Sequence, residues 1–501
     1  MGVAARMSTF YCLAFLSSIR PVITSLANLF NGAPARRFIN RYAPWLVIAL
    51  AAFLRLWQLG YPSKLVFDET YYVKDAWTLW NNGSERAWPN DANPAFESGS
   101  VNTYLSDPSF VVHPPLGKWI IGVGMWLFGP EHSYSWRITT ALLGIAAVAL
   151  LIAIAKLIFK SSAWALAAGF LFAIDGHAIV LARTALLDNS LMFFALLAFY
   201  FLLRDQQHRD LDNLARFRPW LIAAGLSLGA ATAVKWSGLY FIAAFGIYVV
   251  VSEALARRAA GQTDWQTSGL LKQGLFTFAN LVPISAVVYL ASWSGWILTS
   301  GGYDRNVTGN WFTSLIEYHK AAYGFHVGLH TPHNYAANAL SWLFAIRPTS
   351  FFYEGLDLGQ DSCSAIGGCS SAVTALGNPF IWWPAAASVF FLAVWFVKTR
   401  QRTAGIILLG LAGGYLPWLL FLNRTTFQFY AIAFLPWMIL ALIFVARHYV
   451  YQAARPIRAQ GLFLLYAALC LLATIFFLPI WNGAWIPYWY WHIHMWLPSW
   501  I

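Results

Sequence analysis

The chain has 501 residues, of which 59% are hydrophobic and only 10% are charged, and its mean hydropathy is +0.56. Soluble globular domains carry roughly a quarter charged residues, so this composition excludes a soluble protein. The formal net charge is +12 at pH 7. Its distribution along the chain, described below, follows membrane topology and gives no reason to expect a nucleic-acid partner.

Apolar segments of about 20 residues, the length that crosses a bilayer, recur along the chain. The sequence therefore predicts an all-α polytopic membrane protein with about 11 transmembrane helices. We place these helices at residues 43–60, 134–158, 162–181, 185–203, 219–234, 236–252, 274–297, 378–397, 404–422, 427–446 and 461–480. Residues 134–297 thus hold helices 2–7 and residues 378–480 hold helices 8–11.

Basic residues show which side of the membrane each connection faces, because cytoplasmic loops are enriched in Lys and Arg. Residues 1–42 contain five Arg and no evident cleavable signal, which predicts a cytoplasmic N-terminal tail. With that orientation, 20 Lys or Arg but only 5 acids lie in the tail and in the other inner segments. The imbalance favours an odd number of spans and an exoplasmic C-terminus.

Two outer connections, residues 61–133 and 298–377, are too long to be simple links and are expected to carry function. The first begins just before Asp68-Glu69 and ends with a short apolar segment, residues 119–128. We expect that segment to form a helix lying in the membrane interface, started by Pro115. The aromatic tail, residues 481–501, is predicted to lie along the outer interface.

The cysteines predict one disulfide and no metal site. Cys363 and Cys369 lie close together in the second outer loop, where oxidation is allowed, so we expect them to pair. Cys12 and Cys470 are expected to be unpaired. No recognisable set of metal ligands accompanies them. The sequence implies no cofactor, and it leaves open whether a divalent metal is required.

Charged residues cluster at the predicted outer ends of the spans. A lone cation there is explained equally well by snorkelling to lipid headgroups, but several cations and acids at one depth favour a pocket for a lipid phosphate. The acids could then supply a general base for attack of a hydroxyl on an activated sugar. The alternative for Asp68 is a structural pair with Arg55. The set comprises Arg55, Asp68, Glu69, Arg137, Arg183, Asp188, Lys235 and Arg424.

His113 precedes Pro114-Pro115, and the sequence leaves open whether it contacts substrate or only caps the helix that follows. The histidines between residues 319 and 333 match no metal-binding pattern and are expected to lie at the surface or the interface.

Five motifs together resemble the protein O-mannosyltransferases, which transfer mannose from a polyprenyl or dolichyl phosphate and have the GT-C fold. They occur in family order and are joined by a late segment at 423–430. The motifs are Phe-Asp-Glu-Thr-Tyr-Tyr (67–72), His-Pro-Pro-Leu-Gly-Lys (113–118), Trp-Arg-Ile-Thr-Thr-Ala-Leu-Leu-Gly (136–144), Ala-Arg-Thr-Ala-Leu-Leu-Asp-Asn-Ser-Leu-Met-Phe-Phe (182–194) and Ala-Val-Lys-Trp-Ser-Gly-Leu-Tyr (233–240).

The resemblance implies an inverting transfer of mannose from a polyprenyl-phosphate carrier to Ser or Thr of an exported protein, on the exoplasmic face. It implies Asp68 as catalytic base and Glu69 as a supporting carboxylate. The lipid phosphate would be held by Arg137, Lys235 and Arg424. The residues expected to shape the site are Arg55, His113, Asp188 and, from the same outer cluster, Arg183.

The second outer loop differs from that of the eukaryotic family members. Eukaryotic members carry a large β-trefoil insert in the second outer loop, whereas residues 298–377 are too few to hold one. The chain therefore resembles an actinobacterial member acting during export through the plasma membrane, and the secretion machinery is an open question as a further partner. The alternatives are another GT-C enzyme that transfers arabinose or aminoarabinose, and a transporter or flippase. The second is disfavoured because most span centres are apolar.

Overall fold

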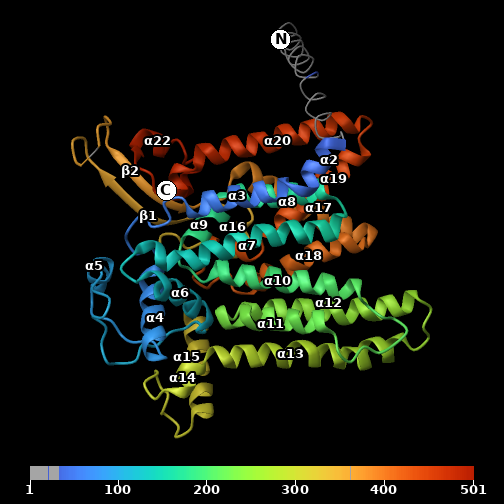
Figure 1. The fold of residues 1–501 in the computed structure, drawn as a ribbon, viewed down its shortest axis with the longest axis horizontal. Coiled ribbons are helices and arrows are strands. Elements are labelled where there is room, and N and C mark those ends of the chain that lie inside the picture. Colours follow the sequence, from blue (N-terminus) through green and yellow to red (C-terminus); the bar gives the residue numbers. More distant parts are fainter. Residues whose placement is uncertain (1–20, 22–32, 362) are drawn as a thin grey trace.

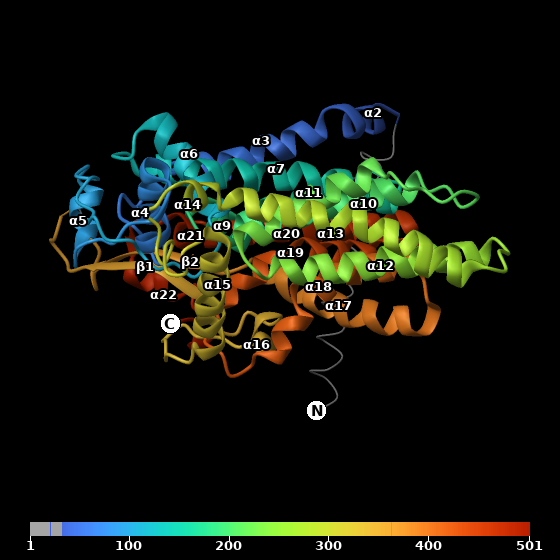
Figure 2. The same cartoon turned by 90° about the horizontal axis from the view of Figure 1, so that it is seen from below.

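The computed structural model describes Pro21, residues 33–361 and residues 363–501 of the chain. Long helices lie side by side along one common direction, which is horizontal in Figures 1 and 2. The two long connections, 61–133 and 298–377, gather at the left of both views, and we call this the loop end of the bundle. Of the predicted cytoplasmic tail, the structure gives helix α2 (Ala33–Arg41), while Cys12 lies outside the described residues.

Each predicted apolar segment contains a helix, because a helix satisfies its backbone polar groups within the segment. The segment 162–181 contains two helices that meet at a bend of 60°. The helices are α3 (Ala43–Leu56), α7 (Ser133–Phe159), α8 (Ser162–Ile174), α9 (Gly176–Arg183), α10 (Asp188–Gln207), α11 (Pro219–Val234), α12 (Gly238–Ala259), α13 (Gln273–Ser292, preceded by the π-helix η1, Gln266–Lys272), α17 (Pro379–Thr399), α18 (Arg402–Gly414), α19 (Leu435–Gln452) and α20 (Pro456–Phe477).

Among the described residues, five helices are long and apolar enough to cross a bilayer, or six if the bent pair α8–α9 counts as one span. The five are α7, α12, η1 with α13, α17 and α20. The prediction of a mostly helical, multi-pass membrane protein is confirmed, whereas the count of 11 spans stays a prediction.

Two predicted spans, 404–422 and 427–446, are interrupted, and a proline lies near each interruption. The segment 404–422 gives α18 and then a 3₁₀ helix, η2 (Leu416–Leu420), with Pro417 in its first turn. The segment 427–446 starts with another 3₁₀ helix, η3 (Gln428–Ala433), and α19 begins only at Leu435, before Pro436. Proline cannot donate the hydrogen bond that would continue a helix through it. Between α18 and α19 the chain therefore forms two short 3₁₀ helices in place of continuous α-helix.

The first long connection folds into three helices at the loop end: α4 (Glu69–Asn82), α5 (Ala92–Glu97) and α6 (Leu116–Phe128). Helix α6 follows Pro115 as expected, and it packs against α4 and α7. Whether α6 lies in a membrane interface stays a prediction.

The second long connection contains strands, which corrects the expectation of an all-α protein. Strands β1 (Thr349–Leu356) and β2 (Cys369–Ala375) form an antiparallel hairpin, and β3 (Ile486–Pro487) from the C-terminal tail pairs with β2. The hairpin loop is closed by the disulfide Cys363–Cys369. The connection also holds α15 (Trp311–Gly328) and α16 (Ala339–Trp342), and α14 (Ser294–Leu298) directly precedes it. Helix α15 runs across the bundle direction (Figure 1).

The C-terminal tail folds onto the loop end. It comprises α21 (Pro479–Asn482), β3, α22 (Tyr488–His492) and the 3₁₀ turn η4 (Pro498–Trp500). Trp481 and Trp500 are buried, and the Arg347 guanidinium donates to the Ser499 carbonyl at 2.6 Å. The tail therefore packs on the second connection, and its predicted contact with the membrane interface is not tested.

Candidate functional site

Asp68 and Glu69, adjacent in sequence, sit at the start of α4. Asp68 occupies the N-cap position and Glu69 is the first helical residue. The residue before them, Phe67, has φ = +50°, a left-handed conformation that is uncommon for any residue except glycine. Such strain persists only where surrounding contacts enforce it, and it often marks functional sites.

Glu69 is buried and holds Arg137 through both carboxylate oxygens. Arg137 Nε lies 2.8 Å from Oε1 and Nη2 lies 2.7 Å from Oε2. Glu69 also accepts hydrogen bonds from the amides of Val66 and Ala185. The remaining donors of Arg137 reach the carbonyls of Leu59, Pro62 and Lys64, so every nitrogen of this guanidinium already has a protein partner.

Arg55 and Arg183 also bind backbone carbonyls. Arg55, which is fully buried, donates to Phe172 and Ala173 at the end of α8. Arg183 donates to four carbonyls where α3 ends, the shortest bond being 2.7 Å to Trp57. The last carbonyls of a helix lack partners within it, so both arginines complete helix ends. The alternative considered for Asp68, a structural pair with Arg55, is not observed.

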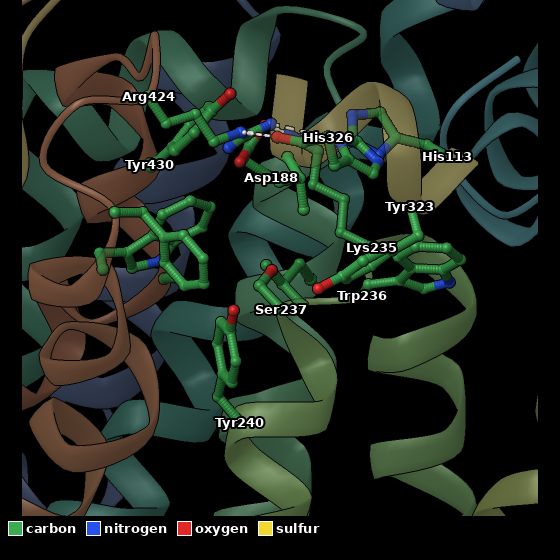
Figure 3. Close-up of a pocket in the computed structure, with 15 residues that line it drawn as sticks. His113, Asp188, Lys235, Trp236, Ser237, Tyr240, Tyr323, His326, Arg424 and Tyr430 are labelled. Carbon is green, nitrogen blue, oxygen red and sulfur yellow. Dashed lines mark hydrogen bonds and ion pairs between the residues drawn. The ribbon is translucent and has the colours of Figure 1, made fainter. Parts of the chain in front are cut away.

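A pocket at the loop end collects other predicted residues. Lys235, in the turn between α11 and α12, extends its Nζ to 2.7 Å from Oδ2 of Asp188, the first residue of α10. Lys235 also lies over the Tyr430 ring, 4.9 Å from its centroid. Figure 3 shows these side chains converging with His113, His326 and Arg424. The surrounding cavity has about 810 Å³ of empty volume, part of it open to solvent.

Arg424 reaches the pocket from the irregular chain before η3. Its Nε donates to the His326 carbonyl at 2.9 Å, and Nη2 lies 3.2 Å from His326 Nδ1. Because the other ring nitrogen of His326 lies 2.9 Å from the Val112 carbonyl, this histidine is the Nε2–H tautomer and is neutral. Burial lowers the pKa of His326 to about 4.

His113 faces the same cavity. Its ring centroid lies 5.2 Å from that of His326. Burial, together with the charges of Lys235 and Arg424 and the adjacent His326, holds the pKa of His113 well below its usual range. Both histidines are thus neutral at pH 7, and the pocket's positive charge comes from Lys235 and Arg424.

Asp68 is not among the residues that line this cavity, but the charges of Lys235 and Asp188 act on it. Burial raises the pKa of Asp68 to about 6, while Lys235 and a hydrogen bond from Tyr72 oppose this increase. A carboxylate with this pKa is ionised at neutral pH and is a stronger proton acceptor than an ordinary aspartate.

Phe67 is a residue that the sequence analysis missed. Its ring packs on four aromatic rings from three distant parts of the chain, with centroid distances of 5.1–5.9 Å. These contacts hold the strained backbone immediately before Asp68. In the sequence, the only feature that pointed to Phe67 was its place in the Phe-Asp-Glu motif. The four partners are His333, Phe351, Phe427 and Phe429.

The cavity adjoins an apolar groove between α12 and α18, and Tyr240 lines both. The groove is lined almost entirely by apolar side chains, including Ala244, Ile247 and Pro417. The cavity that holds Lys235 and Arg424 therefore adjoins an apolar surface along two helices of the bundle. No cluster of three or more potential metal ligands occurs in the described part of the chain.

Two family models match the chain, one in each half. Residues 45–294 match the family described as dolichyl-phosphate-mannose-protein mannosyltransferase, and residues 311–500 match the C-terminal four-transmembrane region of protein O-mannosyltransferases. A polyprenol-phosphate-mannose–protein mannosyltransferase of Mycolicibacterium smegmatis is 32% identical over 91% of this chain and 92% of its own length. The corresponding Mycobacterium tuberculosis protein is 30% identical over 92% and 93%.

The chain belongs to the protein O-mannosyltransferase family. A solved structure of this family, the Saccharomyces cerevisiae Pmt1–Pmt2 complex bound to the sugar donor, superposes with a TM-score of 0.71 over 92% of both chains at 16% identity. This similarity supports the fold of the O-mannosyltransferase chain described here.

Within this O-mannosyltransferase, the pocket joins the two family regions. Asp188 and Lys235 come from the first region, and His326 and Arg424 come from the second. Of the predicted site residues, the structure brings together His113, Asp188, Lys235 and Arg424, with Asp68 nearby. It places Glu69, Arg137, Arg55 and Arg183 in contacts that hold the backbone around α3 and α4.

Proposed function

We propose that this protein transfers mannose, with inversion, from polyprenol-phosphate-mannose to Ser or Thr hydroxyls of exported proteins at the exoplasmic face. The observation that carries the proposal is the cationic pair Lys235 and Arg424, in a pocket beside Asp68 and open to an apolar groove. Polyprenol-phosphate-mannose is the donor named for the mycobacterial relatives.

The donor phosphate binds between Lys235 and Arg424. Arg424 offers a planar set of donors and Lys235 a compact charge, two features that suit a phosphate. Asp188 holds the Lys235 ammonium at 2.7 Å and so fixes its direction. Neutral His113 adds a hydrogen-bonding group without adding charge, and neutral His326 holds the Arg424 guanidinium. The polyprenyl chain lies along the groove between α12 and α18, which is apolar as a lipid tail requires.

Asp68 acts as the general base. The acceptor hydroxyl oxygen attacks the anomeric carbon as its proton passes to the Asp68 carboxylate. The bond between that carbon and the phosphate oxygen breaks, and polyprenyl phosphate leaves with the bonding electron pair. A phosphate departs without prior protonation, so one carboxylate suffices, unlike the paired carboxylates of glycoside hydrolases. A single displacement of this kind inverts the sugar configuration.

In this proposal Arg137 is removed from the set of phosphate ligands suggested by the family motif, because its donors are already bound to Glu69 and to carbonyls. Glu69, Arg55 and Arg183 likewise hold the backbone that presents Asp68. The loop end is exoplasmic, the N-terminus is cytoplasmic and the chain crosses the plasma membrane about 11 times.

The Asp68→Asn variant tests the mechanism. Transfer of mannose to a Thr-containing peptide should fall by about 10²- to 10⁴-fold, the contribution of a positioned base, while binding of the lipid donor is retained. The matched control is Asp107→Asn, which changes an exposed acid in the same connection and should leave the rate unchanged. Near-normal turnover by Asp68→Asn would contradict the assignment of the base.

A comparison of donors tests which sugar the protein transfers. Polyprenol phosphates carrying mannose, arabinose or aminoarabinose are offered to the same peptide, and only mannose should be transferred. Transfer of arabinose or aminoarabinose in preference to mannose would instead support the other type of GT-C enzyme.

A further inference from the structure

The hairpin at the loop end leaves one strand edge without a partner. The strand order is β1-β2-β3, so β1 is paired on one side only. In the described residues, no backbone hydrogen bond to β1 is found besides those of the hairpin itself. An edge strand of this kind presents a row of free N–H and C=O groups.

This edge is only partly protected. Natural edges are shortened or carry charges, Pro or bulges. Strand β1 has eight residues, Thr349–Leu356, with one charged residue, Glu354, and one bulge, but no Lys or Pro. Its outer half is accessible, and Tyr353 is 48% exposed. The edge is therefore available for pairing with another chain.

The hairpin is held firmly in place. The disulfide Cys363–Cys369 closes its loop, and β3 pairs with Cys369 and Ser370 on the far side of β2. Tyr353 packs on Trp491 with ring centroids 5.1 Å apart, and Lys64 forms an ion pair with Glu354 at 3.2 Å. A strand fixed in this way is prepared to receive a partner strand with little further ordering.

The same strand is connected to the catalytic base. The pairing of β1 with β2 shifts register between Ser350 and Phe352, so Phe351 is the extra residue of a β-bulge. Its ring stacks on Phe67 at 5.1 Å, and Phe67 directly precedes Asp68. Bulges beside active sites commonly redirect a side chain. The bulge residue of β1 thus contacts the residue that directly precedes Asp68, while pairing with β2 continues on both sides of the bulge.

We infer that the open edge of β1 binds an extended segment of the acceptor protein by strand pairing, next to the Ser or Thr that receives the sugar. The inference rests on the proposed function. Main-chain hydrogen bonds recognise an extended chain whatever its side chains, which suits an enzyme whose acceptor is protein. Since a strand advances about 3.3 Å per residue, the acceptor hydroxyl lies a few residues beyond the paired segment.

The test uses acceptor peptides in which single backbone amides are N-methylated, one position at a time, on the wild-type enzyme. Strand pairing uses every second amide of the bound chain. Methylation should therefore raise the peptide KM at alternate positions on one side of the acceptor Thr. The expected increase is about two- to tenfold, the value of one hydrogen bond. The KM for the lipid donor should not change.

A photo-crosslinking experiment tests where the acceptor peptide binds. A benzophenone side chain is introduced at Tyr353 of β1 or, as the matched control, at Tyr134, an exposed tyrosine at the start of α7. Peptide should crosslink at position 353 and not at 134.

A KM that does not alternate with position, or crosslinking at position 134 in place of 353, would overturn the inference. The unmethylated peptide separates this result from failure of the proposed function. If that peptide is mannosylated while methylation has no periodic effect, only the strand-pairing inference fails. If it is never mannosylated, the proposed function fails.

Discussion

Asp68 and Glu69 share a peptide bond but not a chemical environment. Glu69 has four hydrogen bonds, two of them from a buried arginine. Asp68 keeps its carboxylate close to the charges of the pocket and receives one side-chain hydrogen bond, from Tyr72. The first residue of α4 therefore fixes the helix to the bundle, which leaves the N-cap residue free for chemistry.

Glu69→Gln should act on stability. The change leaves the Arg137 charge buried without its counter-ion, and breaking a buried pair in this way costs about 3–5 kcal/mol. We expect a marked fall in the thermal unfolding midpoint of the purified protein, whereas Asp68→Asn should melt like the wild type. If Glu69→Gln melted normally but lost mannosyl transfer, Glu69 would belong to the catalytic machinery.

The raised pKa of Asp68 predicts the acid limb of the pH profile. Burial raises this pKa from 3.8 to about 6, and only the ionised carboxylate accepts a proton. Consequently, kcat/KM should be nearly constant above about pH 7 and should fall tenfold per unit well below pH 6. The residual rate of Asp68→Asn, measured over the same range, should lack this limb. A limb near pH 4 would instead indicate an ordinary, solvated aspartate.

The sequence predicted most residues of the candidate site, but it did not predict which of them share one pocket. Sequence placed five basic residues at the loop end, yet only Lys235 and Arg424 face the pocket. Arg137, Arg55 and Arg183 turn toward carbonyls. A hydropathy pattern gives the depth of a residue and not the direction of its side chain. His326 was missed for a related reason, because its role depends on Arg424, 98 residues later.

At the scale of elements, helices were predictable because apolar length alone decides that a membrane segment is helical. The hairpin was not. Strand β1 depends on contacts with β2 and, through the bulge residue Phe351, with Phe67, which is far away in sequence. Strand β3 depends on a tail more than 100 residues after β2. Local sequence patterns therefore do not predict pairing between strands that are far apart in the chain.

Removing the disulfide should loosen the hairpin without unfolding the bundle. For a loop this small, the chain-entropy relation gives a stabilisation of about 2 kcal/mol. The double variant Cys363→Ser/Cys369→Ser should therefore be cut faster by a protease specific for Glu and Asp, within residues 354–368, while the rest of the chain resists. The control is Cys470→Ser, a buried free cysteine, which should digest like the wild type. Equal digestion of all three proteins would contradict this prediction.

At the scale of the whole molecule, the charge pattern predicts orientation. Single cysteines replace Ser98 at the loop end and Asp212 in the basic connection between α10 and α11; both positions are exposed. A membrane-impermeant maleimide should label Ser98→Cys in intact cells and Asp212→Cys only after permeabilisation. The wild type, labelled in parallel, accounts for the native cysteines. The reverse pattern would place the loop end in the cytoplasm.

The residues that line the pocket are synthesised at different times. Asp68, Asp188 and Lys235 emerge from the ribosome long before His326 and Arg424, which complete the cavity. A chain that stops within its first 300 residues therefore contains Lys235 but lacks Arg424. In the proposed mechanism such a chain has an incomplete phosphate site, so we expect it to transfer no mannose.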